Sequence, residues 1–388
     1  MCRVRDGRRG RAETFRGPKG RPSMSADPSI DLDGAPVLVT GAAGFAWDHR
    51  AERSLAAGRE VLGVDNLSDY YNVALKRARL VKLKRHAGFS FWKVDMSDAG
   101  AVYSVFAEAR PRIVANLAAQ TGLWYSLDNP RACGRVNLSG FLNVLEACGA
   151  VDVHRLVHAS LGSVYGGNTK LPFSEQDAAD HPVSLYAATK RANELMAHSY
   201  AHVFGLPATG LRFFTAYGPW GRADMAYYRI FAEAILADRP ITLFNHGHKE
   251  RDPTYLGDVV DAVERLLPRP PQPDQTFDRG SPDRARGWAP HRVFNAGNPR
   301  REPISALIAM LEAELGATTR RISAEMAPGD VLVTLADVSA LTEAVGYAPK
   351  VSLAEGLAMF VKWFKACRTD AGGAEAVTRS EAQRTRTQ

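Results

Sequence analysis

The sequence predicts an α/β protein built on a doubly wound parallel sheet, with a smaller C-terminal subdomain. Apolar runs alternate with helix-forming stretches from residue 37 to about 165, which is typical of strand–helix repeats. These runs are apolar throughout, as strands covered on both faces are. The composition, 45% hydrophobic and 23% charged over 388 residues, is that of a globular chain, and no apolar run reaches the roughly 18 residues that a membrane span needs.

Each element follows from its residues. Strands are expected at 36–41, 60–66, 89–96, 112–119 and 155–160, and helices between them at 73–85, 99–109 and 138–150. A helix at 184–205 and a strand at 208–214 continue the series. The stretch 269–290 is rich in Pro, Gly, Arg and Asp and predicts a long surface loop, after which helices are expected at 303–316 and 353–367.

The positive charge is concentrated at the N-terminus. Residues 1–23 carry eight Arg or Lys and two Asp or Glu, a net of +6 out of +7 for the whole chain. A nucleic-acid-binding protein would spread basic residues over a folded face, so nucleic acid is not an expected partner. The segment lacks the apolar core of a secretory signal, and Met24 offers a second start, so it is interpreted as a disordered or a mis-assigned extension.

The cysteines indicate the compartment. Cys2, Cys133, Cys148 and Cys367 show no paired spacing, so we expect neither a zinc site nor a disulfide framework, and no metal. A reducing, cytoplasmic setting is therefore expected.

A glycine-rich turn, GAAGF at 41–45, follows the first strand and precedes helix-forming residues. Backbone N–H groups at such a helix start can cradle a pyrophosphate. Asp65 ends the second strand about 20 residues later, where a carboxylate binds ribose hydroxyls and repels a 2′-phosphate. These residues predict a Rossmann-type site for NAD rather than NADP, and a helix cap is the alternative role for Asp65. Trp47 occupies the position of the third glycine, where an indole is expected to displace the helix.

A tyrosine and a lysine are spaced to share one face of the helix at 184–205. Tyr186 and Lys190 are four residues apart, and a lysine beside a tyrosine lowers the pKa of the phenol. Such a tyrosine can exchange a proton with a sugar hydroxyl while a nicotinamide takes hydride. A solvent-facing helix pair is the alternative.

These residues together resemble the extended short-chain dehydrogenase/reductases of the NAD-dependent epimerase/dehydratase family, and the chain is similar to the UDP-glucuronate 4-epimerases within it. The resemblance runs from about 36 to 366 and includes the stretches VDNLSDYYNVALKRARL, SVYGGNTKLPFSE, DHPVSLYAATKRANELMAHSYAHVFGLPATGLRFFTAYGPWGRADMA and APGDVLVTLADVSAL. We therefore expect a disordered basic extension at 1–33, a part at 34–215 that is mainly the NAD-binding domain, a part at 216–366 that is mainly the UDP-sugar subdomain, and a polar tail at 367–388. A homodimer is also expected.

The resemblance also implies site residues. For NAD these are Gly41, Gly44, Phe45, Asp65, Asn66, Asp95, Ala118, Ala119, Tyr186 and Lys190. Tyr186 would be the acid/base, Lys190 its partner, and Asn137 a support within a helix. Thr215 would meet the sugar nucleotide, with Arg251, Asp258 and Asp330 on the UDP part. Arg222 and Arg229 are candidates for the glucuronate carboxylate, because guanidinium pairs bidentately with carboxylate.

The chain departs from the family pattern at four positions. Besides Trp47, Leu161 replaces the catalytic hydroxyl residue of the turn HASLGSVYG, and its neighbour Ser163 is the candidate to take over this role. Trp124 replaces a usual arginine, and Pro253 a usual aromatic, which removes a backbone donor. The expected reaction is C4 epimerisation of UDP-glucuronate through a 4-keto sugar. A degenerate homologue that serves as a binding or partner subunit, and a UDP-glucose/UDP-galactose 4-epimerase, are the alternatives.

Overall fold

The computed structural model describes residues 4–5, 32–45, 47, 54–56, 58–222, 227–325 and 331–369. Its centre is an eight-stranded sheet in which every neighbouring pair is parallel, with the order β1-β4-β3-β2-β5-β6-β7-β12. The order reverses direction at β2, which is the topological switch point of a doubly wound fold. The predicted fold class is therefore confirmed.

Six strands of the sheet closely match the predicted ranges, and they are β2 (Val37–Thr40), β3 (Val61–Asp65), β4 (Phe89–Lys93), β5 (Ile113–Asn116), β6 (Arg155–Leu161) and β7 (Ala208–Phe213). No range was predicted for the other two, β1 (Val4–Arg5) and β12 (His291–Ala296). The helices that pack on them are α2 (Val73–Leu83), α3 (Ala99–Ala109), α6 (Gly140–Val151), α7 (Leu185–Phe204), α9 (Leu256–Leu266) and α11 (Ser339–Val345). Two short helices, α4 (Leu123–Asp128) and α5 (Pro130–Gly134), lead into a π-helical turn, η1 (Arg135–Ser139).

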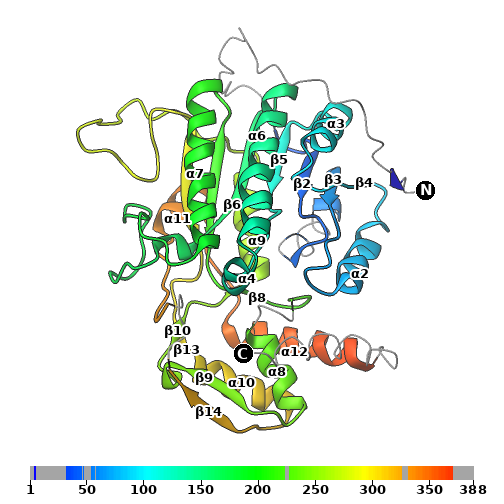
Figure 1. Cartoon of the computed structure of the whole chain (residues 1–388), viewed down its shortest axis with the longest axis vertical. Coiled ribbons are helices and arrows are strands. Elements are labelled where there is room, and N and C mark those ends of the chain that lie inside the picture. The colour runs from blue at the N-terminus through cyan, green and yellow to red at the C-terminus, as the bar shows by residue number, and fades with distance from the viewer. Residues whose placement is uncertain are drawn as a thin grey trace.

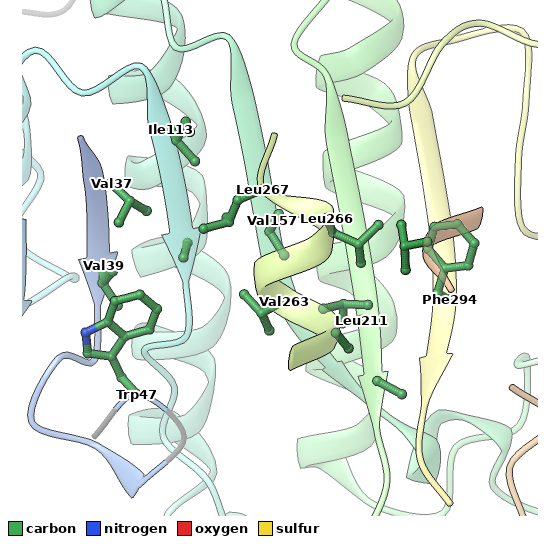
Figure 2. Close-up of a cluster of buried hydrophobic side chains, with 14 of the residues drawn as sticks. Val37, Val39, Trp47, Ile113, Val157, Leu211, Val263, Leu266, Leu267 and Phe294 are labelled. Atoms are coloured by element: carbon green, nitrogen blue, oxygen red, sulfur yellow. The ribbon is translucent and has the colours of Figure 1, made fainter. Parts of the chain in front are cut away.

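Alternate side chains of each strand enter two separate hydrophobic cores. Leu38 of β2 packs with α3, α6 and α7 on one face of the sheet, where these helices lie side by side (Figure 1). Val37 and Val39 pack on the other face with α9 and α11. Figure 2 shows this second core, with Val263 of α9 near the strands. Because both faces are covered, the strands are apolar throughout.

Caps define the ends of α7, the helix that carries the predicted acid/base. The hydroxyl of Ser184 accepts a hydrogen bond from the N–H of Ala187 at 3.1 Å, which satisfies one of the orphan donors at a helix start. At the other end Gly205 takes a left-handed conformation with φ of +70°, which glycine adopts without a steric penalty. The first turn of α7, and Tyr186 with it, is therefore held in place.

The second lobe packs α8 (Tyr227–Leu236), α10 (Ile304–Leu315) and α12 (Leu353–Thr369) together, below the sheet in Figure 1. Its strands β9 (Ile241–Phe244) and β14 (Arg321–Ala324) are parallel. Two further pairings involve strands of two residues each: β8 (Ala216–Tyr217) with β11 (Thr254–Tyr255), and β10 (Glu250–Arg251) with β13 (Glu302–Pro303).

Two features of the structure bear on the predicted domain boundaries, which stay a prediction. The chain leaves the sheet near residue 216, and α9, β12 and α11 return to it, so the range 216–366 belongs to the second lobe only in part. Within the predicted disordered extension, β1 pairs with β4 at the edge of the sheet, and Leu32 is buried in the core with 2% of its surface exposed. Residues 6–31 and the tail from 370 lie outside the described residues, so disorder there stays a prediction.

The predicted surface loop at 269–290 has turns and no helix in the structure. Its end is fastened to α7, because the indole N–H of Trp288 donates to Nδ1 of His202 at 3.0 Å. In the described part of the chain, no helix combines the length and the apolar character that crossing a membrane requires.

Candidate active site

One cavity of about 510 Å³ lies where the carboxyl ends of β2, β3, β5 and β6 meet the loop after β7. In doubly wound folds ligands bind at this edge, beside the switch point. Most of the predicted site residues line it: Gly41, Gly44, Phe45, Asp65, Asn66, Asp95, Ala118, Ala119, Ser163, Tyr186, Lys190, Thr215 and Arg222. The sheet therefore brings together residues that are almost 180 positions apart in sequence.

The glycine-rich turn requires both of its glycines. Gly41 has φ of +74°, and a Cβ atom there would stand 2.9 Å from the backbone nitrogen of Ala118. A Cβ on Gly44 would stand 2.8 Å from the carbonyl oxygen of Gly41. Any larger residue would thus force the turn away from β5. The turn is closed by the N–H of Gly44, which donates to that same carbonyl at 2.8 Å.

Asp65 is tied to the glycine turn, and its role toward a ribose stays a prediction. Its carboxylate accepts hydrogen bonds from the N–H groups of Ala43, at 3.1 Å, and Leu67, at 2.7 Å, and it lines the cavity. A carboxylate has about four acceptor positions, so two of them are open to further donors. The bond to Ala43 ties the end of β3 to the glycine turn, and the shape of the turn depends on Asp65.

A second carboxylate lies beside Asp65. Asp95 accepts hydrogen bonds from the N–H and the hydroxyl of Ser97, at 2.8 and 2.7 Å, and from the amide of Asn66 at 3.1 Å. Burial alone would raise the pKa of this carboxyl, but these donors outweigh it and hold the pKa below its usual value. Asp95 is therefore an ionised acceptor at the cavity wall.

Trp47 is not in the cavity. Its indole is 1% exposed and belongs to the core on the α9 face, together with Val39 and Ile113 (Figure 2). The prediction that this indole displaces the following helix cannot be followed through residues 48–53, which lie outside the described part of the chain. At the described residues the finding is that the indole is absorbed by the core and the glycine turn remains closed.

The Tyr186–Lys190 pair lines the cavity, but its electrostatics differ from the prediction. Burial raises the pKa of the Tyr186 phenol, and the cation that most opposes this rise is Arg222. Lys190 is 2% exposed, and its ammonium donates to the carbonyl oxygen of Ala159 at 2.9 Å. Burial lowers the pKa of Lys190 to about 8. The expectation that Lys190 lowers the pKa of Tyr186 is therefore wrong for the protein without ligands, because Lys190 is bonded to the backbone of β6.

Asn137 lies in the π-helical turn η1, behind this pair. Its amide group donates to the carbonyl of Gln120 at 3.0 Å, and its side-chain oxygen accepts from the N–H of Gln120 at 2.8 Å. In this wider turn the backbone carbonyl of Asn137 accepts a hydrogen bond from the side-chain amide of Asn193 at 2.8 Å. Single π turns are frequent at functional sites. Here the turn fixes the backbone that follows β5, and these contacts agree with a supporting role.

The hydroxyls near Leu161 have separate roles. Ser160 donates to the carboxylate of Glu194 at 2.6 Å, and Glu194 is in turn paired with Arg212 at 2.8 Å in the buried interior. Ser160 is thus committed to this network. Leu161 and Ser163 both line the cavity, and no hydrogen bond of the Ser163 hydroxyl is found among the described residues. Ser163 is therefore the hydroxyl of this turn that can serve a ligand.

Three predicted substrate residues lie outside the cavity lining. Arg229 pairs with Glu233 at 3.0 Å on α8. Arg251 donates to the carbonyls of Glu250, Val331 and Leu332. Asp258 accepts from the N–H of Val351 at 3.1 Å at the start of α9. In this structure these side chains bond neighbouring residues outside the cavity lining, and their role as ligand contacts stays a prediction. Asp330 lies outside the described residues.

The departures at Trp124 and Pro253 also lie away from the cavity lining, and the Trp124 side chain is half exposed. Conversely, the cavity has lining residues that the sequence did not single out. They are Ser68, Tyr71, Lys76, Gln120, Thr121, Phe213, Phe214, Tyr227 and Thr334, among others. The helical period of 73–85 would place Lys76 and Arg79 on one face, but it does not say that this face is buried.

The residues present fit a dinucleotide. The turn is kept small by two glycines, and ionised Asp95 and the carboxylate of Asp65 lie at the edge of the sheet where the adenosine half of such a cofactor binds. The amide nitrogen of Gln120 is buried in the same wall with no hydrogen-bond partner among the described residues. Buried polar groups are rarely left unpaired, so this one points to a bound partner.

Comparison with known proteins identifies the family. Residues 38–360 match the family model described as GDP-mannose 4,6 dehydratase. The chain is 41% identical over 364 residues to UDP-glucuronate 4-epimerase 4 of Arabidopsis thaliana, covering 91% of this chain and 81% of that protein. It is 42% identical to Protein CapI of Staphylococcus aureus, covering 84% and 98% of the two chains.

Solved structures agree. UDP-glucuronic acid 4-epimerase from Bacillus cereus, in complex with UDP-glucuronic acid and NAD, matches with a TM-score of 0.75 and 28% identity over 86% of this chain and 99% of that chain. UDP-glucose 4-epimerase from Thermotoga maritima matches with a TM-score of 0.74 and 29% identity, with the same coverage. The chain belongs to the GDP-mannose 4,6-dehydratase family, among the NAD-dependent epimerases and dehydratases.

Proposed function

We propose that the protein is an NAD-dependent isomerase that inverts C4 of a UDP-sugar, converting UDP-glucuronate into UDP-galacturonate through a 4-keto sugar. The observation that carries the proposal is that a single cavity combines the glycine turn and Asp65 with Tyr186, Lys190 and Arg222. Relatives named UDP-glucuronate 4-epimerase or probable UDP-glucuronate 4-epimerase support the same reaction.

The cofactor would lie along the edge of β2, β3 and β5. When bound, NAD supplies a hydride acceptor and, later, the hydride donor. The N–H groups of residues 41–44 are bonded within the protein, so the two glycines would serve to let the pyrophosphate approach the start of the following helix at Phe45. Asp65 would accept from the ribose hydroxyls, while Asn66 and Asp95 would lie near the adenine. The small side chains of Ala118 and Ala119 leave room for the cofactor beside β5.

Tyr186 would move the proton. Its phenolate oxygen accepts the proton of the sugar O4 hydroxyl while C4 loses hydride, and the same oxygen returns the proton after the keto sugar has turned its other face. Burial opposes the phenolate, and Arg222 is the cation that most lowers the pKa of Tyr186. Lys190 is one helical turn away, and its ammonium would hold the nicotinamide ribose in addition to the carbonyl of Ala159.

Ser163 would supply the hydroxyl that the site lacks at Leu161. A leucine side chain cannot hydrogen-bond O4, whereas Ser163 lines the cavity with its hydroxyl free of described partners. Without a donor to O4 the reaction loses an interaction of about 1–3 kcal/mol, so turnover depends on how well Ser163 reaches the sugar. For the glucuronate carboxylate, Arg222 and the hydroxyl of Thr215 are the proposed partners.

The experiment is conversion of UDP-glucuronate by protein loaded with NAD, followed by chromatographic separation of the two UDP-uronates. We expect UDP-galacturonate to form, and Tyr186→Phe to reduce the rate by at least about 100-fold because it removes the transferable proton. The matched control is Tyr103→Phe on the exposed surface of α3, which should leave the rate unchanged.

Two results would favour the alternatives. Interconversion of UDP-glucose and UDP-galactose, with no reaction of the uronate, would favour the second substrate class, which the likeness to the Thermotoga epimerase brings into consideration. NAD that is bound, with no turnover of either pair, would favour a binding or partner subunit. In either case the proposed reaction would be wrong.

We also propose that the protein forms a homodimer through α6 and α7. Leu142 on α6 and Leu195 and Val203 on α7 expose 37%, 57% and 58% of their surface, and the two helices lie side by side on one face (Figure 1). Exposed apolar side chains gathered on neighbouring helices are typical of an interface. Light scattering should show a dimer that Leu195→Glu dissociates. Val81→Glu on α2 is the control, because Val81 is equally exposed (56%) and should not affect assembly. The proposed compartment is the cytoplasm.

A further inference from the structure

Arg79 of α2 connects two segments that each contribute residues to the cavity lining. Its side chain is fully buried, and one guanidinium nitrogen donates to the carbonyl of Ala43 at 2.8 Å and to the hydroxyl of Tyr71 at 2.9 Å. The other terminal nitrogen donates to the carbonyl of Trp220. Ala43 belongs to the glycine turn, and Trp220 belongs to the segment that carries Arg222. A single planar group thus touches the cofactor side and the sugar side.

The contacts of Arg79 are to neutral groups. No ion pair of Arg79 with a carboxylate is found among the described residues, whereas buried Arg212 is paired with Glu194. Burying a cation without a counter-charge is costly. The fork of a guanidinium can, however, bind several oxygens at fixed angles, which an ammonium cannot do. The contacts of Arg79 use this geometry rather than its charge.

The segment that Arg79 holds is conformationally strained. Trp220 has φ of +63°, a left-handed conformation that is unfavourable for a bulky residue. Its ring lies beside Trp363 of α12, with centroids 5.5 Å apart, and beneath the ammonium of Lys82 at 4.7 Å. The bond from Arg79 to its carbonyl fixes the peptide that leads toward Arg222. Strain of this kind persists only where neighbouring contacts determine the conformation.

Arg79 reaches Arg222 by a second route. The guanidinium of Arg222 lies over the rings of Tyr70 and Tyr71, 4.9 and 4.7 Å from their centroids, and it also bonds the hydroxyl of Thr121. The hydroxyl of Tyr71 is the one that Arg79 bonds. The direction of the Arg222 side chain therefore depends on Arg79 through Trp220 and through Tyr71.

We propose that Arg79 is a positioning residue that couples the two ligand sites, so that a sugar nucleotide bound at Arg222 strengthens the hold of the glycine turn on the dinucleotide. A ligand carboxylate that binds Arg222 where it lies over the ring of Tyr71 holds Tyr71 and Trp220 in place, and these fix Arg79 against Ala43. The guanidinium then restrains the glycine turn, and the cofactor leaves more slowly. The inference rests on the proposed function, because it uses the ligands assigned there.

The experiment measures release of NAD from the holoprotein after rapid dilution, with and without UDP-glucuronate. It is carried out in the Tyr186→Phe background so that the sugar nucleotide binds without turnover. We expect the sugar nucleotide to slow release by at least about 5-fold, the lower end of ordinary coupling between sites. With Arg79→Gln the release rates with and without UDP-glucuronate should differ by less than about 2-fold. Arg79→Lys should not restore the difference seen in the parent.

Arg155 provides a matched control. It is also fully buried, and it also bonds neutral oxygens, the carbonyl of Leu266 and the hydroxyl of Thr209, but neither of these partners lines the cavity, whereas Tyr71 does. Arg155→Gln should lower stability and leave the release ratio unchanged. Tyr71→Phe keeps the ring under Arg222 and removes one bond to Arg79, so it should reduce the ratio even if Arg79→Gln does not fold.

The outcomes separate the two proposals. If UDP-glucuronate slows NAD release equally in the parent and in the Arg79 and Tyr71 variants, the role of Arg79 is overturned and the proposed function is not. The role of Arg79 is also overturned if Arg155→Gln lowers the ratio of the two NAD release rates as much as Arg79→Gln does. It is likewise overturned if the parent binds NAD but its release rate does not change with UDP-glucuronate. A parent that holds no NAD would overturn the proposed function and this inference together.

Discussion

Replacing Trp47 tests where the unexpected side chain of the glycine-rich segment lies. The indole is 1% exposed and packs in the core on the α9 face (Figure 2). A tryptophan buries about 150–250 Å², which at about 25 cal/mol per Å² corresponds to roughly 4–6 kcal/mol as an upper estimate. Trp47→Ala keeps one carbon and lets the site partly collapse, so we expect a loss of about 3–5 kcal/mol.

Urea unfolding followed by circular dichroism measures this loss. Trp124→Ala is the control, because half of the Trp124 side chain is exposed and its removal should change the free energy of unfolding by less than about 1 kcal/mol. Trp47→Gly, which would restore the glycine of the fingerprint, should destabilise the fold by about 1 kcal/mol more than alanine because Trp47 is helical. A loss below about 1 kcal/mol for Trp47→Ala, or tighter NAD binding by Trp47→Gly, would refute the assignment of the indole to the core.

Three further predictions concern the hydroxyl at the site, the cofactor and acid stability. Leu161→Ser should change the rate of UDP-glucuronate conversion little, because Ser163 already supplies the donor to O4, and a rise of about 10- to 100-fold, which corresponds to a restored donor worth about 1–3 kcal/mol, would contradict that role of Ser163. Calorimetric titration should give weaker binding for NADP than for NAD, because Asp65 opposes a 2′-phosphate, and equal affinities would contradict that role. Burial lowers the pKa of His158 to about 3. Below the ordinary pKa of about 6.5, the unfolded chain therefore binds a proton on this imidazole that the folded chain does not. Lowering the pH from 7 to 5 should thus reduce the free energy of unfolding by about 2 kcal/mol through His158. His158→Leu should remove that part of the acid sensitivity in urea titrations at the two pH values, and an undiminished pH dependence would show that other groups carry it.

The fold could be predicted because its signal is local and repeated. Buried parallel strands such as 61–65 are continuous apolar runs, and turns and helices of ordinary composition separate them. The pairing of β1 with β4 could not be predicted, because Val4 and Arg5 stand in a segment whose charge favours disorder. The return of α9 and β12 to the sheet depends on long-range packing, for which no local sequence pattern exists.

The candidate site could be predicted where its residues lie on one element or at strand ends. Gly41, Asp65 and the Tyr186–Lys190 pair share the cavity as expected. The direction of the Tyr186 pKa was predicted wrongly, because burial and the bond from Lys190 to Ala159 depend on the folded surroundings.

Residues contributed by the second lobe were the hardest to predict. Arg229 and Arg251 have the right chemistry for an anionic sugar nucleotide, but their hydrogen bonds go to neighbours within that lobe or to its backbone. Arg79 stands in a run of four basic residues within seven, which by itself suggests a solvated helix face. Only the folded structure shows that this guanidinium is buried between the glycine turn and Trp220.

The fate of the hydrogen at C4 tests the central claim most directly. Protein loaded with NAD is given UDP-glucuronate carrying deuterium at C4, and the product is analysed by NMR and mass spectrometry. Because the cavity would hold the cofactor and the keto sugar together until hydride returns to the same carbon, the account predicts UDP-galacturonate that retains deuterium at C4. Product that has exchanged this deuterium with water, or bound NAD with no product at all, would contradict it.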